Sequence, residues 1–419
     1  MPADPATAAA DAQRIYWGRV LAATMRMARD VDVAEEATAD AFLLALQTWP
    51  ERGVPDSVEA WLLTAAKRRA IDRIRRLVRL RERVAMLAVT TDVVAAPADE
   101  MVDAPAVLDD ELRLVVLCCH PALSAEARVA LTMRLGCGVP TAAIAAAFLV
   151  SVPTMAARLT RAKQRIAGSG AGVELPDDVA VEERMPAVRR TVHLAYTMGH
   201  TAGAGAALRD DDVAAHALRL ARSLQRLRPD DSEVTGLLAL LLLTEARAAG
   251  RFAGDGSQVV LADADRTSWD PALLEEGLAL VDGLALERSG PLGRQAGIAA
   301  EHARAPSFAA TDWARVIEHY DALLHAEPSP VIALGRCVAV SYRYGAAAGL
   351  ADLEGVLAIG TLDGYPYAHA ARAQLLERVG RPADAAAAWR DASSCARSDA
   401  ERTWFGERAA AAAVSSPVS

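Results

Sequence analysis

The stretch from Ala60 to Arg83 places the strongest constraint on how this chain can fold. Nine Lys or Arg stand between Lys67 and Arg83 against Asp72 and Glu82, a net charge of +7. Such dense charge repels itself unless it is solvated or lies against a polyanion, of which nucleic acid is the usual one. Apolar residues recur in the same stretch at helical spacing and predict one buried stripe: Leu62, Leu63, Ala66, Ala70, Ile71 and Ile74. We therefore predict an amphipathic helix whose free side is either a solvated basic face or a nucleic-acid contact.

The composition favours helices over sheets. Hydrophobic residues make up 53% of the 419 residues, largely Ala and Leu, whereas aromatic residues make up only 5%. Small apolar side chains suit closely packed helices and suit strands poorly. A chain of this length is too long for one ordinary core, so two or three domains are expected. We predict an all-α protein.

Several classes of protein are disfavoured by what the sequence lacks. No apolar run approaches the ~20 residues of a membrane span, and no basic start followed by an apolar core suggests a signal peptide. The five cysteines are an odd number without framework spacing, which indicates a reduced, cytoplasmic protein. There is no phosphate-cradling Gly loop, HExxH motif or nucleophile elbow, so we expect neither an enzyme nor a cofactor.

Two groups of residues invite a metal-binding interpretation. Cys118-Cys119-His120 with Cys137 has no second pair at metal spacing, so these cysteines are predicted to be core residues. The acidic runs 210–212 and 263–270 are predicted to cap the helices that follow them, because carboxylates accept hydrogen bonds from the first amides of a helix. We therefore expect no metal site.

Charge is unevenly distributed along the chain. Residues 1–170 hold 21 Lys or Arg and 20 Asp or Glu, whereas the remainder holds 24 and 34. The first part, at net +1, is the candidate nucleic-acid binder, and the acidic second part is not.

The chain before the basic helix predicts two further helices. They are expected over 13–28 and 33–48, with Asp32 as N-cap of the second and Glu35 at the third position after it. The second helix carries an acidic outer face with Glu35, Glu36 and Asp40. Residues 49–57 are predicted to be a loop by their Pro and Gly content, with Ser57 capping the basic helix. The side chains predicted to face a core are Ile15, Val20, Leu21, Met25, Ala37, Ala41, Leu44 and Leu46.

A second DNA-binding signal follows an acidic linker. Helical periodicity fades from 87 to 110, returns over 112–119 and 124–135, and is ended by Gly136-Cys137-Gly138. A short helix over 141–148, a turn capped by Ser151, and a second helix from Val152 predict a helix-turn-helix, although a plain helical hairpin would look similar. The predicted buried stripe is Val152, Met155, Leu159, Ala162 and Ile166, which leaves Thr154, Ala157, Arg158, Arg161, Lys163 and Arg165 outside or on the flanks.

After a Gly-rich linker at 168–178 the chain is helical to about residue 412. The segments 331–344 and 345–358 resemble 367–379 and 380–395, and their glycines Gly345 and Gly380 are 35 residues apart. This is close to the ~34-residue period of tetratricopeptide repeats. Breaks at 227–230 and 326–329 separate further hairpins. We predict an α-solenoid that holds a partner; a compact helical domain without a repeat groove is the alternative.

Taken together, these motifs resemble a sigma factor of the extracytoplasmic-function (ECF) class with a C-terminal tetratricopeptide-like extension. Residues 34–42 are similar to the helix that grips the RNA polymerase β′ clamp, although Ala39 stands where the family usually has Gln. Residues 53–55, 60–66 and 69–73 resemble the region that reads the −10 element, with Arg68 where the family tends to have Asn. Residues 112–135 with the helix-turn-helix resemble the domain that binds the −35 element and the β flap. Segments similar to the extension are 118–123, 261–270, 290–291, 311–313 and 329–334; Thr197 and Met198 replace an expected Asn and Glu.

The resemblance implies four parts: sigma region 2 at 10–84, an acidic linker at 85–109, sigma region 4 at 110–170, and a regulatory helical domain at 178–414. Its implied partners are core RNA polymerase, promoter DNA and a protein that binds the helical domain. Contacts to the −10 region are expected from Arg52, Asp56, Ser57, Lys67, Arg68, Arg69, Arg73 and Arg76. Contacts to the −35 region are expected from Thr154, Arg158, Arg161, Lys163 and Arg165, and contacts to the polymerase clamp from Glu36 and Asp40.

Two other functions fit parts of the pattern. A one-component DNA-binding regulator with a repeat-type sensor domain would bind a duplex operator without polymerase, but it needs neither the basic helix nor the clamp-like helix. An adaptor that has lost promoter binding would accommodate Ala39 and Arg68.

Overall fold

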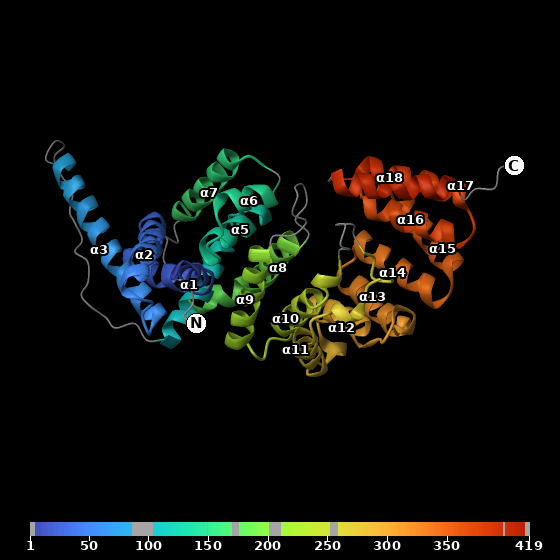
Figure 1. Ribbon diagram of the computed structural model, residues 1–419, viewed down its shortest axis with the longest axis horizontal. Helices are drawn as coiled ribbons and strands as arrows, with labels where there is room; N and C mark the ends of the chain where they lie inside the picture. The colour runs from blue at the N-terminus through green and yellow to red at the C-terminus, as the bar shows by residue number, and fades with distance from the viewer. Residues whose placement is uncertain are drawn as a thin grey trace. The chain divides into compact units, whose positions relative to one another are not determined.

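A computed structural model of the protein describes residues 5–85, 104–148, 150–169, 176–200, 211–251, 259–396 and 399–414. Every regular element in these ranges is a helix (Figure 1). The chain divides into two compact units: α1 to α9 belong to the first, and α10 to α18 to the second. The predicted all-α fold class is confirmed.

The first unit begins with three long helices that pack on one another. They are α1 (Pro5–Ala28), α2 (Val31–Arg52) and α3 (Val58–Ala85). Their shared core is built around Trp17, Phe42, Trp49 and Leu62. The remaining elements of this unit are α4 (Ala104–Cys118), α5 (Ala125–Leu131), the π-helical segment η1 (Thr132–Gly136), α6 (Thr141–Ala147), α7 (Val152–Ala167), α8 (Asp178–His200) and α9 (Asp211–Leu227).

Helix α2 differs from its predicted bounds at both ends. Asp30, not Asp32, is the N-cap, since its side chain accepts a hydrogen bond from the Val33 amide at 2.9 Å. The helix also continues beyond residue 48 through Pro50 to Arg52, so the predicted loop begins only at Gly53. Pro50 removes one amide donor from the last turn, but the neighbouring Trp49 is anchored in the core, and Gly53, with φ of 80°, ends the helix.

Three side chains predicted to be buried are exposed: Ile15, Leu46 and Val152. Leu46 lies about 40° around α2 from the buried Phe42, at the edge of the buried face of the helix and not within it. Val152 is the first residue of α7. The other predicted core positions are buried or partly buried.

The predicted helix over 124–135 is two elements. Ser124 caps α5, since its hydroxyl accepts from the Ala127 amide at 3.3 Å. The chain then widens into the π-helical segment η1, an arrangement that is rare and often found at functional positions. Gly138, with φ of 71°, turns the chain after it. Helix α4 begins at Ala104, earlier than the return of periodicity at 112.

The second unit is a series of helical hairpins. Its α-helices are α10 (Ser232–Glu245), α11 (Pro271–Asp282), α12 (Pro291–Arg304), α13 (Trp313–Ala326), α14 (Pro330–Arg343), α15 (Ala346–Leu357), α16 (Pro366–Arg378), α17 (Pro382–Cys395) and α18 (Asp399–Val414). The predicted repeat is confirmed as the hairpins α14–α15 and α16–α17. Gly345 and Gly380 both have positive φ, 101° and 76°, at the turns of these hairpins. Both predicted breaks also fall between helices.

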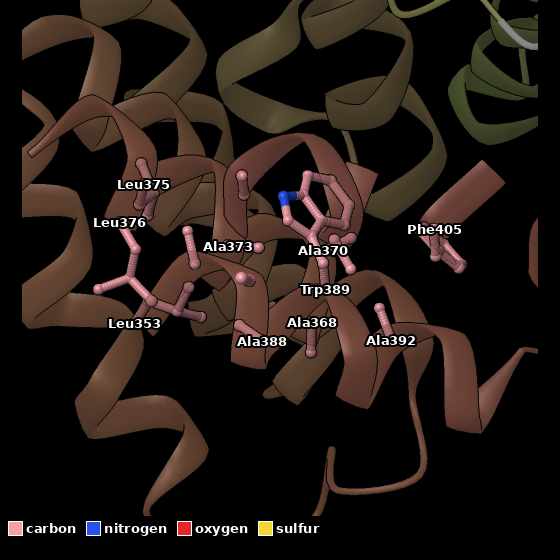
Figure 2. Packing of buried hydrophobic residues seen from close by; sticks show 14 of the residues in the cluster. Leu353, Ala368, Ala370, Ala373, Leu375, Leu376, Ala388, Trp389, Ala392 and Phe405 are labelled. Atoms are coloured by element: carbon pink, nitrogen blue, oxygen red, sulfur yellow. The ribbon is translucent and has the colours of Figure 1, made fainter. Parts of the chain in front are cut away.

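Alanine dominates the packing at the C-terminal end of this unit. Figure 2 shows Trp389 of α17 among Ala368, Ala373, Ala388 and Ala392. The indole nitrogen donates to Glu377 at 2.8 Å, so the one polar atom of this buried side chain is satisfied. Small residues let the helices approach closely enough to enclose the large ring, which is how a chain poor in aromatics forms a solenoid core.

Two aspartates of the acidic run 263–270 cap the elements that follow them. Capping by the run 210–212 stays a prediction, since Asp211 and Asp212 are the first residues of α9 itself. Asp265 accepts from the Thr267 amide, and Asp270 accepts from the Ala272 and Leu273 amides at the start of α11. Residue 210 lies outside the described residues. In the described part of the chain, no three His, Cys, Asp or Glu side chains gather as metal ligands would.

Within the same residues, no single helix is both long and apolar enough to cross a membrane; only α6 and α7 taken together, as a bent pair, reach that length and composition.

Candidate nucleic-acid and polymerase interface

The basic side of α3 and the loop before it form the first predicted site. Arg68, Arg69 and Arg76 are exposed along the helix, and Lys67 is partly exposed. The other predicted contacts, Arg52, Asp56 and Ser57, are exposed at the end of α2 and in the loop that joins it to α3. The buried side of α3 packs on α1 and α2, so the helix presents a fixed row of cations.

Arg73 is the exception in this row, because it turns toward α2. Its guanidinium pairs with Glu36 and, at 3.1 Å, with Asp40. One predicted DNA contact thus binds both residues predicted to contact the polymerase clamp. The three side chains bring α2 and α3 together.

The outer side of α2 carries more than acids. Glu36, Asp40, Leu43 and Gln47 follow one another at spacings of four, three and four residues, which places them on one stripe of the helix. Leu43 is 53% exposed on this stripe. An exposed leucine about one turn from an acid, Asp40, fits a partner surface that is basic and partly apolar. The sequence interpretation missed Leu43; an apolar residue away from the buried stripe of α2 was the available signal.

Helices α6 and α7 meet at 104°, within the range of a helix-turn-helix. Ser151 caps α7, accepting from the Thr154 amide at 3.3 Å. Met155, Leu159 and Ala162 are buried as predicted, and this stripe holds α7 in place. The predicted helix-turn-helix is confirmed as a fold.

Four of the five predicted −35 contacts share one edge of α7: Thr154, Arg158, Arg161 and Arg165. Their spacings of four, three and four residues place them in a row, and all four are exposed. The three arginines border a groove of about 500 Å³ between α5 and α7. Its floor is apolar, with Leu123, Ala127, Phe148 and Leu159 among the lining residues.

Lys163, the fifth predicted −35 contact, lies on the opposite flank of α7. Its ammonium pairs with Glu35 at 2.6 Å and Asp32 at 2.8 Å, both on α2. Burial alone would lower the pKa of Lys163, but the hydrogen bonds and charges of the two carboxylates outweigh burial and raise the pKa. The contact of Lys163 with DNA therefore stays a prediction that requires these ion pairs to open.

Comparison with known proteins agrees with the order of these elements. The family model of sigma-70 region 2 matches residues 14–80, and that of sigma-70 region 4 matches residues 113–166. A family of unknown function (DUF6596) matches residues 184–285. The two sigma matches cover the basic helix and the helix-turn-helix, and they define a transcription initiation factor of the sigma-70 class.

Individual relatives extend the comparison. An uncharacterised protein of Rhizobium meliloti is 39% identical over 393 residues, which are 92% of each chain. The ECF RNA polymerase sigma factor SigK of Mycobacterium sp. (strain KMS) is 36% identical over 101 residues, 23% of this chain and half the length of SigK. The crystal structure of yeast Tom70 aligns with 92% of this chain and with 80% of the Tom70 chain. The sequence identity is 13% and the TM-score is 0.29.

The chain belongs to the ECF class of RNA polymerase sigma factors. Membership implies core RNA polymerase and promoter DNA as partners, and the family is not enzymatic.

Proposed function

We propose that this protein starts transcription at specific promoters by binding core RNA polymerase and recognising a −10 and a −35 element. The observation that carries the proposal is the pair of separate basic surfaces in one chain, on α3 and on one edge of α7. A sigma factor needs both, because it reads two promoter elements at once.

At the −10 element, the loop 53–57 and α3 act together. The loop residues cradle an unstacked base of the non-template strand, while Lys67, Arg68 and Arg69 hold phosphates. The three-helix core supports this role, since it fixes α3 relative to the loop. Glu36, Asp40 and Leu43 bind the β′ clamp through charge and apolar contact.

At the −35 element, the edge of α7 enters the major groove. Thr154 and Arg158 lie in its N-terminal half, the part of a recognition helix that reaches base edges, and Arg161 follows about one turn later. The apolar groove between α5 and α7 receives the β flap of the polymerase. The helical hairpins of the second unit regulate activity by binding a protein.

The test is run-off transcription with purified core polymerase on genomic promoter fragments. Transcripts that require the protein support the proposal, and their start sites identify the two elements. Arg158→Ala with Arg161→Ala is expected to lower promoter-specific transcription at least tenfold, because each base contact contributes about 1–3 kcal/mol. Unchanged transcription by the double variant would exclude contact of α7 with the major groove of the −35 element.

A matched control separates base reading from general charge. Arg288 is exposed at the end of the short 3-10 helix Leu286–Arg288 in the second unit; Arg288→Gln removes a cation outside both proposed promoter-binding surfaces. If the protein binds duplex DNA but drives no transcription with polymerase, the one-component regulator is the better description.

A further inference from the structure

Regions 2 and 4 are joined by ion pairs centred on one carboxylate. Glu35 lies on α2, only 8% exposed, and receives Arg134 from η1 at 2.6 Å and Lys163 from α7 at 2.6 Å. These partners lie 99 and 128 residues away along the chain. A buried carboxylate is costly unless cations pair with it, and Glu35 obtains both of its cations from region 4.

Close packing accompanies the charges. The indole nitrogen of Trp17 in α1 donates to the Leu135 carbonyl in η1 at 3.1 Å. Gly138 lies against the same indole, where a Cβ atom would come within 2.5 Å of the ring. Gly18 meets Gly136 in the same way, with a Cβ only 2.5 Å from its carbonyl oxygen. The contacts between the two regions are therefore as close as those within a protein core.

Two neighbouring acids of α4 extend this junction. Asp110, whose side chain is 1% exposed, pairs with Arg26 of α1. Glu111 accepts from Arg19 of α1 at 3.3 Å. Burial raises the pKa of Glu111, and Arg19 offsets part of that effect. We call the contacts of Glu35, Asp110 and Glu111 with α1, η1 and α7 the interregion clasp.

The first two helices of the extension brace the clasp from the region 4 side. Arg113 of α4 binds the Pro176 carbonyl and Asp178 at the start of α8. Cys119 donates to the Thr191 hydroxyl of α8 at 3.4 Å. Arg219 of α9 reaches back to the Arg14 carbonyl of α1. The extension therefore contacts both promoter-binding regions.

We propose that the interregion clasp, braced by α8 and α9, holds regions 2 and 4 in a closed form, which must open before the chain occupies core polymerase and both promoter elements. This inference rests on the proposed function. Four carboxylates on α2 already pair with cations of the same chain: Asp32 and Glu35 with Lys163, and Glu36 and Asp40 with Arg73. Polymerase and DNA would each have to displace a contact already made within the protein. Binding is weakened by the fraction of molecules that are closed.

The test weakens the clasp without touching the proposed DNA or clamp residues. Arg134→Gln with Asp110→Asn in the full chain removes one partner from two of the four ion pairs of the clasp, Glu35–Arg134 and Asp110–Arg26. Glu51→Gln, at an exposed acid on α2, is the matched control. Hydrogen exchange is read at the amides of η1, residues 132–136, after thermal unfolding has shown that each variant is folded. The clasp variant is expected to exchange at least about tenfold faster there, with the control like wild type.

The affinity for core polymerase is then measured for the same three proteins. A clasp variant that binds roughly three- to tenfold more tightly than wild type supports the proposal. Faster exchange at η1 without tighter binding overturns it, and so does unchanged exchange in a folded variant. If the variant does not fold, the wild-type chain decides: bound polymerase must accelerate exchange at η1, and protection that is unchanged on binding overturns the closed form.

Failure of the proposed function gives a different result. If neither wild type nor variant binds polymerase, the sigma assignment fails and the masking role falls with it, whereas the exchange data still report whether the clasp joins the regions.

Discussion

At the scale of single residues, exposure distinguishes a leucine proposed to bind polymerase from one that packs in the core. Leu43 is 53% exposed, whereas Leu62 of the packed helix α3 is fully buried. Leu43→Asp is expected to weaken binding to core polymerase about tenfold, with the free energy of unfolding within about 0.5 kcal/mol of wild type. Leu62→Ala is expected to cost about 2–5 kcal/mol of stability. Urea unfolding and a polymerase-binding titration measure both; a Leu43 variant that binds normally would remove this residue from the interface.

A buried histidine makes the second unit sensitive to acid. His319 of α13 is almost fully buried, and neither ring nitrogen has a hydrogen-bond partner among the described residues. Burial, followed by the nearby charges of Arg294, Arg315 and Arg304, lowers its pKa to about 4. The folded state therefore favours the neutral ring, and this contribution to stability is full above the unfolded pKa of about 6.5 and is lost as pH falls toward 4.

The expected loss between pH 7 and pH 5 is about 2 kcal/mol for this residue. His319→Gln should flatten the dependence of unfolding free energy on pH, even if it lowers stability at pH 7. His325→Gln, at an exposed position of the same helix, is the control and should keep the wild-type slope. Equal slopes in all three proteins would show that His319 is protonated without cost.

At the scale of the element, two glycines define the repeat hairpins. Gly345 and Gly380 have φ of 101° and 76°, and a Cβ atom added at either would meet nothing within 4 Å. The cost of Gly345→Ala or Gly380→Ala is therefore that of the backbone alone, about 1 kcal/mol each. Gly355→Ala in α15 has equally open surroundings but helical φ, so it should stabilise by about 0.5–1 kcal/mol. Denaturant unfolding distinguishes the three variants. A change in unfolding free energy of the same sign for all three would contradict this account.

These elements also show what local sequence can and cannot predict. The hairpins α14–α15 and α16–α17, the helix-turn-helix and the buried side of α3 were predictable, because periodicity and glycine placement are local. The continuation of helix α2 past Pro50 was not predictable, since burial of Trp49 is a tertiary effect. Neither was the clasp, because Glu35 and its partners are about a hundred residues apart. Contact of the site residues with polymerase and DNA stays a prediction.

At the scale of the whole molecule, the extension does not begin where the first unit ends. Most of α8 and all of α9 lie within the family match at 184–285, yet both helices belong to the same compact unit as α1 to α7. The Cys119 thiol of the first unit shows how α8 protects region 4. It is covered by α8, burial raises its pKa to about 11, and it bonds to Thr191. A fragment cut in the linker before α8 would uncover it.

We therefore expect fragments 1–172 and 1–227 to behave differently. Fragment 1–227 keeps all nine α-helices assigned to the first unit. The thiols of Cys118, Cys119 and Cys137 should therefore react with a thiol reagent as slowly as they do in the full chain. Fragment 1–172 should gain one rapidly reacting thiol, which Cys119→Ser abolishes, and should melt several degrees lower because the faces of α4 and α5 that pack on α8 are exposed. Equal reactivity and equal melting temperature would mean that region 4 does not need α8 and α9 for its fold. A difference would mean that removing the extension at residue 172 disturbs the promoter-binding regions themselves, so regulation by the second unit has to be tested with a cut after Leu227.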